Sequence, residues 1–77
     1  MAPGKGVRLH RHPYVEIFVV DEGEATFTVG EATLVVAAPK VVVAAANIPH
    51  RFVNSGLVVL RQTDIHLSGR FVTEWLE

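Results

Sequence analysis

Four side chains in this sequence have the types and spacing of a ligand set for one metal ion. His10 and His12 are separated by a single residue, so on a β-strand their imidazoles leave the same face, roughly 7 Å apart at the backbone, and can converge on one ion. Glu16 follows the break made by Pro13, at the start of the next predicted strand, where an antiparallel neighbour can aim a carboxylate at the same point. His50 enters a later strand directly after a turn and offers a fourth ligand.

This ligand set defines the chemistry that an ion could perform. Three neutral imidazoles and one carboxylate suit Mn, Fe, Co, Ni, Cu or Zn better than Ca or Mg. Four protein ligands leave one or two positions open on a five- or six-coordinate ion, and water or a substrate can bind there. Such an ion can act as a Lewis acid, lower the pKa of its bound water or, if it is redox-active, activate dioxygen.

The elements that must position these ligands are predicted to be strands throughout. Runs of valine, threonine and phenylalanine alternate with Gly, Pro, Asn and Asp, and no segment has helical periodicity. The predicted strands are 7–12, 15–20, 25–29, 33–37, 41–44, 51–53, 57–65 and 70–75. Many short strands separated by regular turns favour a sandwich or a barrel, and a barrel would leave no open sheet edges.

Turn residues predict how these strands connect. The glycines at 21–24 and 30–31 predict two hairpins, so neighbours in sequence should pair antiparallel. Residues 54–56 form the next predicted turn. Pro39 interrupts an alanine- and valine-rich stretch and favours two strands over one helix.

Around the first three ligands the sequence matches a longer pattern. Gly4, His10, His12, Glu16 and Gly23 fit G-x5-H-x-H-x3-E-x6-G at every fixed position and every spacing. A chance match is on the order of one in ten million per start position, given average usage of about 7% for Gly and a few per cent for His and Glu. The pattern is the first motif of the cupin superfamily, which this sequence therefore resembles.

The second cupin motif, G-x5-P-x-G-x2-H-x3-N, is matched in part. His50 and Asn54 stand at its histidine and asparagine. Asn47 replaces the second glycine, and Asn tolerates this exchange because it adopts the left-handed region more readily than other non-glycine residues. Ala45 and Pro39 replace the motif's proline and its opening glycine.

The resemblance spans about residues 4–54 by motif, and the tail at 70–76 also resembles the endings of small single-domain cupins. It implies one domain over residues 1–77 with an all-β fold, a small antiparallel β-barrel or double-stranded β-helix of the jelly-roll type. It also implies one divalent transition-metal ion, with ligands His10, His12, Glu16 and His50. The activities it implies are those of dioxygenases, isomerases, decarboxylases and lyases, beside non-catalytic binding proteins.

We expect first a small metalloenzyme, a dioxygenase-like oxidoreductase that holds Mn or Fe and acts on a small organic molecule; Cu, Ni, Co and Zn also fit the ligands. No general acid or base is evident, so no catalytic residue is assigned. The alternative is a non-catalytic metal- or ligand-binding module, either a sensor or a scaffold. A third interpretation is a barrel whose site stays empty.

Several residues outside the ligand set are candidates for a substrate pocket, namely Arg8, Tyr14, Phe18, Phe52 and Gln62. Arg8 has the same strand parity as the first two histidines, although a solvated arginine is the simpler interpretation. The aromatic residues could equally be core. Asp64 and His66 resemble a supporting pair beside a metal site, but surface or subunit contact is the safer interpretation. Trp75 is expected to pack as an anchor or in a dimer interface.

Length and composition limit the remaining possibilities. A domain of 77 residues buries only about 60% of the surface that its unfolded chain exposes. No cysteine can form a disulfide or a thiolate site, so metal binding or oligomerisation must add stability. A net charge of -1 argues against a nucleic-acid partner, and no apolar run is long enough to span a membrane. We expect a cytoplasmic protein with a small-molecule substrate or ligand.

Assembly is the last expectation. The chain is 49% hydrophobic and only 19% charged, so part of its apolar surface should face a second copy. Small cupins usually carry a strand or two before the first motif, which here begins at Gly4, so the fold is expected to be minimal at its N-terminal side. The chain is either a trimmed form of a longer protein or a barrel completed by a partner subunit in a homodimer.

Overall fold

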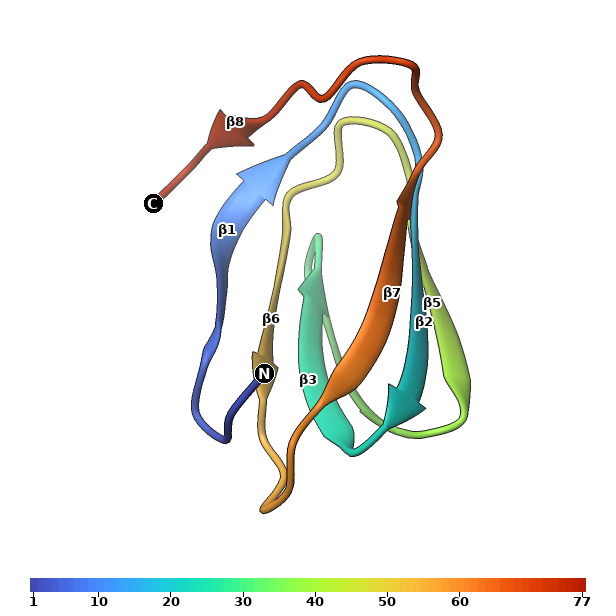
Figure 1. The fold of residues 1–77 in the computed structure, drawn as a ribbon. Helices are drawn as coiled ribbons and strands as arrows, with labels where there is room; N and C mark the ends of the chain where they lie inside the picture. The colour runs from blue at the N-terminus through green and yellow to red at the C-terminus, as the bar shows by residue number, and fades with distance from the viewer.

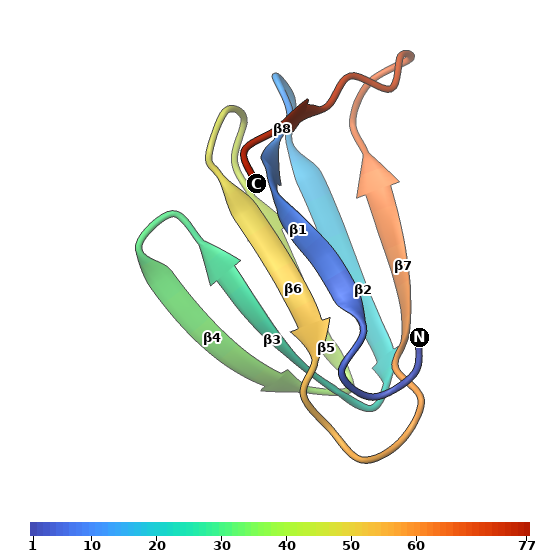
Figure 2. The same ribbon diagram turned by 90° about the vertical axis from the view of Figure 1, so that its left-hand side faces the viewer.

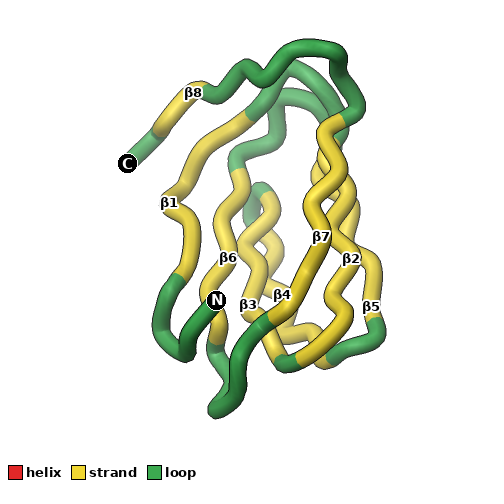
Figure 3. The backbone as a smooth tube through the Cα atoms, in the orientation of Figure 1, coloured by secondary structure: helices red, strands yellow, loops and turns green.

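The computed structural model describes residues 1–77 as a chain of eight β-strands without a helix (Figures 1 and 3). The strands are β1 Gly6–Arg11, β2 Glu16–Glu22, β3 Glu24–Val29, β4 Ala32–Ala37, β5 Lys40–Ala44, β6 His50–Asn54, β7 Arg61–His66 and β8 Glu74–Trp75. Accordingly, no helix is present that is long and apolar enough to cross a membrane.

The strands form two antiparallel sheets that enclose the core. The larger sheet has the order β4-β3-β6-β1-β8 and the smaller one the order β5-β2-β7. Figure 2 shows the neighbouring strands β4, β3, β6 and β1 of the larger sheet side by side. The all-β prediction and the jelly-roll architecture are confirmed, but the two sheets do not join into a closed barrel.

The two predicted hairpin turns differ in outcome. Gly30, with φ of 59°, turns the chain between β3 and β4, which pair with each other, so this hairpin is confirmed. The hairpin predicted at 21–24 is wrong, because β2 pairs with β5 and β7 whereas β3 pairs with β4 and β6. At Gly23, where φ is +89°, a Cβ would approach the carbonyl oxygen of Val59 to 2.9 Å. The chain makes a tight corner there and passes from one sheet to the other.

Two predicted strands are shorter in the structure. The segment predicted as a strand at 57–65 becomes extended only from Arg61, and the one at 70–75 is reduced to β8. The buried amide of Asn54 explains the first difference, since its Nδ2 donates to the carbonyl oxygen of Val58 at 2.9 Å. This bond ties the loop after β6 back to the end of that strand.

The apolar core lies between the two sheets. Its centre is a group of phenylalanines, in which the ring of Phe18 on β2 lies 5.0 Å from that of Phe27 on β3 and 5.8 Å from that of Phe52 on β6. Full burial of such a side chain stabilises the fold by about 1.5–3 kcal/mol. The ring of Phe18 also lies 5.7 Å from that of His50, so the core ends where the histidines begin.

A bulge in β1 determines which of its side chains face inward. The pairing of β1 with β6 changes register between Val7, opposite Phe52, and His10, opposite His50. A regular strand would send Val7 and His10 to opposite faces. The bulge places both against the interior, where Val7 packs on the core and His10 is buried. It therefore aims the first histidine between the sheets.

Candidate metal centre

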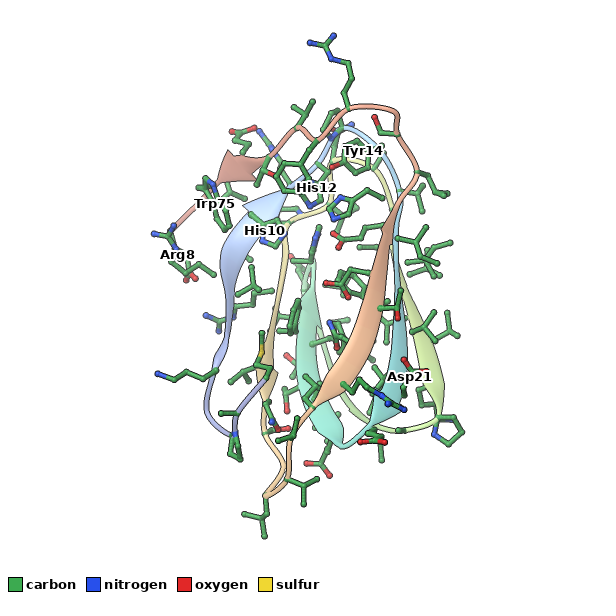
Figure 4. The ribbon with its side chains drawn as sticks, viewed as in Figure 1. Arg8, His10, His12, Tyr14, Asp21 and Trp75 are labelled. Atoms are coloured by element: carbon green, nitrogen blue, oxygen red, sulfur yellow. The ribbon has the colours of Figure 1, made fainter.

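The four predicted ligands meet in one buried cluster at the end of the sandwich. His10, His12, Glu16 and His50 are each at most 5% exposed, and their ligand atoms lie within 4.8 Å of one another. His10 belongs to β1, His12 to the segment just after it, and His50 to the start of β6; Figure 4 shows the first two at the same end of the molecule.

Glu16 reaches the cluster from the other side. It lies at the start of β2 in the smaller sheet, whereas β1 pairs only with β6 and β8 in the larger one. The expectation that Glu16 comes from an antiparallel neighbour of the histidine strand is therefore wrong. The ligand set bridges the two sheets instead of lying along one hairpin.

Backbone carbonyls orient all three imidazoles of the cluster. The Nδ1 of His10 lies 2.7 Å from the carbonyl oxygen of Arg8, that of His12 lies 2.7 Å from Val72 O, and that of His50 lies 2.9 Å from Ile48 O. A carbonyl oxygen only accepts hydrogen bonds, so each Nδ1 carries the proton. In a neutral ring the Nε2 lone pair is then free and directed away from that contact, which is the arrangement of metal-binding histidines.

The same tautomers leave the centre of the cluster in need of a cation. Glu16 Oε1 lies 3.0 Å from the Nε2 of His12 and 3.1 Å from the Nε2 of His50. With both rings neutral, an anionic oxygen faces two nitrogen lone pairs, and the buried Nε2 of His12 has no hydrogen-bond partner. A proton or a metal ion removes this repulsion. The donor atoms present therefore fit a divalent transition-metal ion.

Burial and the neighbouring charges shift the pKa values of the cluster in different directions. Burial lowers the pKa of His50, but the hydrogen bonds to Glu16 and to the Ile48 carbonyl, with the charge of Glu16, raise it overall above 6.5. Burial raises the pKa of Glu16, and the hydrogen bond from His50 with the neighbouring histidine charges lowers it overall below 4.5. Burial is the main cause that lowers the pKa of His10. The negative charge of Glu16 therefore favours a cation, either a proton or a metal ion, at the His50 nitrogen, and the two compete for it.

His66 lies beside this cluster, although the sequence interpretation placed it at the surface or in a subunit contact. It is opposite Glu16 in the pairing of β2 with β7, and its Nε2 lies 3.3 Å from Glu16 Oε2. The hydroxyl of Tyr14 is 2.7 Å from His66 Nδ1. The alternation of Asp64 and His66 along β7 was the available signal, since both share the inward parity of that strand.

A cavity of about 230 Å³ adjoins the ligands. Beyond the ligands, its walls include Phe52, Asp64, His66, Phe71, Thr73 and Trp75. Burial, and then the negative charge of Glu16, raises the pKa of Asp64 above 3.8, although this side chain keeps contact with solvent. A small molecule in this cavity would lie against the cluster between aromatic walls.

Three of the five pocket candidates lie near the cluster or in the core. Phe52 lines the cavity, and Tyr14 stacks on the ring of His12 with a centroid distance of 4.9 Å. Phe18 is fully buried, so it contributes to the core and to no cavity wall.

The two polar pocket candidates lie away from the ligands. Arg8 lines a cavity of about 530 Å³ on the outer face of the larger sheet, with its guanidinium 4.9 Å from the ring centroid of Trp75 (Figure 4). The β1 bulge accounts for this position, because it removes the parity that Arg8 would share with His10. Gln62 faces inward on β7, where its amide donates to Asp64 Oδ1 at 2.9 Å.

The C-terminal tail completes the site, and no sequence signal indicated how. Its Val72 supplies the carbonyl that orients His12, and the ring of Trp75 lies 5.1 Å from that of His10. Glu74 attaches the tail to β1 through two hydrogen bonds from Arg11, at 2.8 and 3.1 Å. These bonds raise the pKa of Arg11 and lower that of Glu74.

Comparisons with known proteins agree with this architecture. Residues 1–66 match the family described as the cupin domain. A double-stranded β-helix protein from Klebsiella pneumoniae, uncharacterised by its description, superposes with a TM-score of 0.89 at 22% identity over 97% of this chain. A protein of unknown function from Streptococcus pyogenes gives 0.82 at 20% identity over 91%, and a cupin superfamily protein from Desulfitobacterium hafniense gives 0.69 at 17% over 86%.

These solved structures are longer than the present chain, which spans 63%, 60% and 56% of their respective lengths. None of the curated proteins matches the sequence. At these identities the structural similarity shows the shared fold alone.

Proposed function

The chain belongs to the cupin domain family, and from this premise we propose that it binds one divalent transition-metal ion through His10, His12, Glu16 and His50. The observation that carries the proposal is the set of three Nδ1 contacts to backbone carbonyls. They leave three Nε2 lone pairs in a buried cluster with one carboxylate oxygen, and a metal ion satisfies all four atoms at once.

As activity we propose a dioxygenase-like oxidoreductase that holds Mn or Fe and acts on a small organic molecule. When bound, such an ion supplies Lewis-acid and redox chemistry at an open coordination position. The chain supplies the binding space, a cavity of about 230 Å³ beside the ligands. Phe71 and Trp75 in its walls favour an apolar or flat substrate.

A non-catalytic metal- or ligand-binding module is the second candidate. The small number of polar side chains in the cavity favours this second candidate. Beyond the ligands, only Asp64, His66 and Thr73 offer polar side chains there. An enzyme that moves protons usually places a general acid or base within hydrogen-bond reach of its substrate. A scaffold or sensor has no such requirement.

Metal content of the purified protein tests the binding proposal. We expect about one Mn or Fe per chain after reconstitution and gel filtration, and loss of that metal in Glu16→Gln. Glu31→Gln is the matched control, since Glu31 is an exposed glutamate in the β3–β4 turn. Equal metal content in Glu16→Gln and wild type would contradict the site.

Turnover distinguishes the two candidates. Oxygen consumption by the Mn- and Fe-loaded protein is measured with a panel of small enols, phenols and thiols, which are readily oxidised and can ligate a metal. Uptake that depends on the metal and disappears in Glu16→Gln supports the oxidoreductase. Full metal loading with no uptake across the panel supports the binding module.

A further inference from the structure

The two carboxylate oxygens of Glu16 have different surroundings. Oε1 faces the cluster, 3.0 Å from the Nε2 of His12 and 3.1 Å from that of His50. Oε2 faces away from these rings and lies 3.3 Å from the Nε2 of His66. One oxygen is therefore available for a metal ion, and the other is available for a protein donor.

The carboxylate of Glu16 determines the tautomer of His66 and so the role of its contact with Tyr14. The Tyr14 hydroxyl lies 2.7 Å from His66 Nδ1 and can donate its proton there. His66 then carries its own proton on Nε2, the nitrogen that lies 3.3 Å from Glu16 Oε2. In the opposite tautomer the Nε2 lone pair would face a carboxylate oxygen, which is repulsive. The favoured direction is Tyr14 to His66 to Glu16.

We propose that Tyr14 and His66 are positioning residues that hold Glu16 Oε2 by hydrogen bonding and leave Oε1 as its single metal ligand. This inference rests on the proposed metal binding. In this arrangement His66 supports the carboxylate and is itself no ligand, in agreement with its position outside the cluster of ligand atoms.

Packing restrains each member of this hydrogen-bonded chain. His66 is opposite Glu16 in the β2–β7 pairing, so the backbone ladder sets their separation. The Tyr14 ring is stacked on His12 at an interplanar angle of 9°, which fixes the direction of its hydroxyl. The His66 side chain is only 25% exposed, so its bonds are partly shielded from water. Outer hydrogen-bond partners of this kind orient metal ligands and increase their basicity.

Variants at both positions test the proposal with metal affinity as the readout. Tyr14→Phe removes only the hydroxyl, His66→Leu removes the donor, and His66→Gln keeps an N–H group that can reach Glu16. We expect Tyr14→Phe and His66→Leu to weaken Mn²⁺ affinity by about 10- to 100-fold in competition with a chelator, and His66→Gln to lose less. The absorption spectrum of bound Co²⁺ should change in the first two variants, because it reports the ligand geometry.

Thr63→Val is the matched control, since Thr63 lies on the same strand with its side chain on the exposed outer face. Its affinity and Co²⁺ spectrum should equal those of wild type. The melting temperature of each metal-free variant separates a folding defect from a ligand defect, and Tyr14→Phe keeps the test decisive if His66→Leu fails to fold.

The outcomes separate this inference from the function on which it rests. Wild type that binds neither Mn²⁺ nor Co²⁺ overturns the metal-binding proposal itself. Wild type that binds, with Tyr14→Phe and His66→Leu within threefold of its affinity and unchanged in spectrum, overturns the positioning role alone. A loss in His66→Leu with no loss in Tyr14→Phe removes Tyr14 from the proposal.

Discussion

Metal binding should stabilise this fold strongly, because the ligands come together only when the two sheets are assembled. A ligand present at 100 times its Kd adds about 2.7 kcal/mol to the free energy of unfolding if the unfolded chain does not bind it. For a domain of this size, 1 kcal/mol shifts the Tm by about 4–8 °C. The expected rise is therefore about 11–22 °C at that metal concentration.

Any metal binding by the unfolded chain reduces this rise in Tm, and the size of the reduction can be tested. His10, His12 and Glu16 lie within one short segment and can bind weakly without the fold, whereas His50 joins them only in the folded state. Metal-induced stabilisation should therefore be small in His50→Gln, and unchanged in the exposed control Glu31→Gln.

Differential scanning fluorimetry or calorimetry of metal-free protein, titrated with Mn²⁺ or Zn²⁺, measures the shift directly. The readout is the difference between metal-loaded and metal-free Tm for each variant, so a variant that is less stable in itself remains interpretable. An equal shift in His50→Gln and wild type would refute the reasoning, as would the absence of any shift in wild type at millimolar metal.

Further predictions concern charges and apolar surface outside the ligand set. Arg11 lowers the pKa of Glu74, so this carboxylate stabilises the fold above pH 4.5 and loses that effect as the pH falls through its lower folded-state pKa. In urea titrations, Glu74→Gln should therefore have a smaller free energy of unfolding than wild type at pH 7, and this difference should disappear in acid. The pKa of Asp64 is raised by burial, so Asp64→Asn should stabilise the metal-free protein at pH 7 and have no effect below pH 3.8. If the predicted homodimer forms through the apolar outer face of the smaller sheet, where Val43 is 56% exposed, Val43→Lys should give a monomer in analytical ultracentrifugation whose Tm is independent of concentration.

Local spacing made the cluster predictable from sequence. His10, His12 and Glu16 are close along the chain, so their proximity follows from short spacing, although Glu16 joins the histidines from the opposite sheet and not from a hairpin partner. His50 is distant, and its placement depends on the turn before β6. The φ of 66° at Asn47 shows why that turn forms, since Asn takes the left-handed conformation expected of glycine in the second motif.

Features that depend on long-range register were not predictable. The bulge in β1 moves Arg8 to the outer face, and no residue type in the strand signals it. His66 meets Glu16 only because β7 pairs with β2 across fifty residues of sequence, a pairing that local periodicity does not specify. The turn at Gly23 has the composition of a hairpin turn. Whether the strands on its two sides pair in one sheet or enter two different sheets depends on how the whole core packs.

The position of the ligand cluster between two separate sheets has a consequence for local opening. The ligands occupy one end of the sandwich, while Asn54 and its bond to Val58 hold a loop elsewhere in the fold. A bound ion would cross-link β2 to β1 and β6, two strands of the other sheet with which β2 shares no ladder hydrogen bonds. Amide hydrogen exchange in those three strands should then slow together on metal binding, while the amides of the 55–60 loop continue to exchange at their former rate.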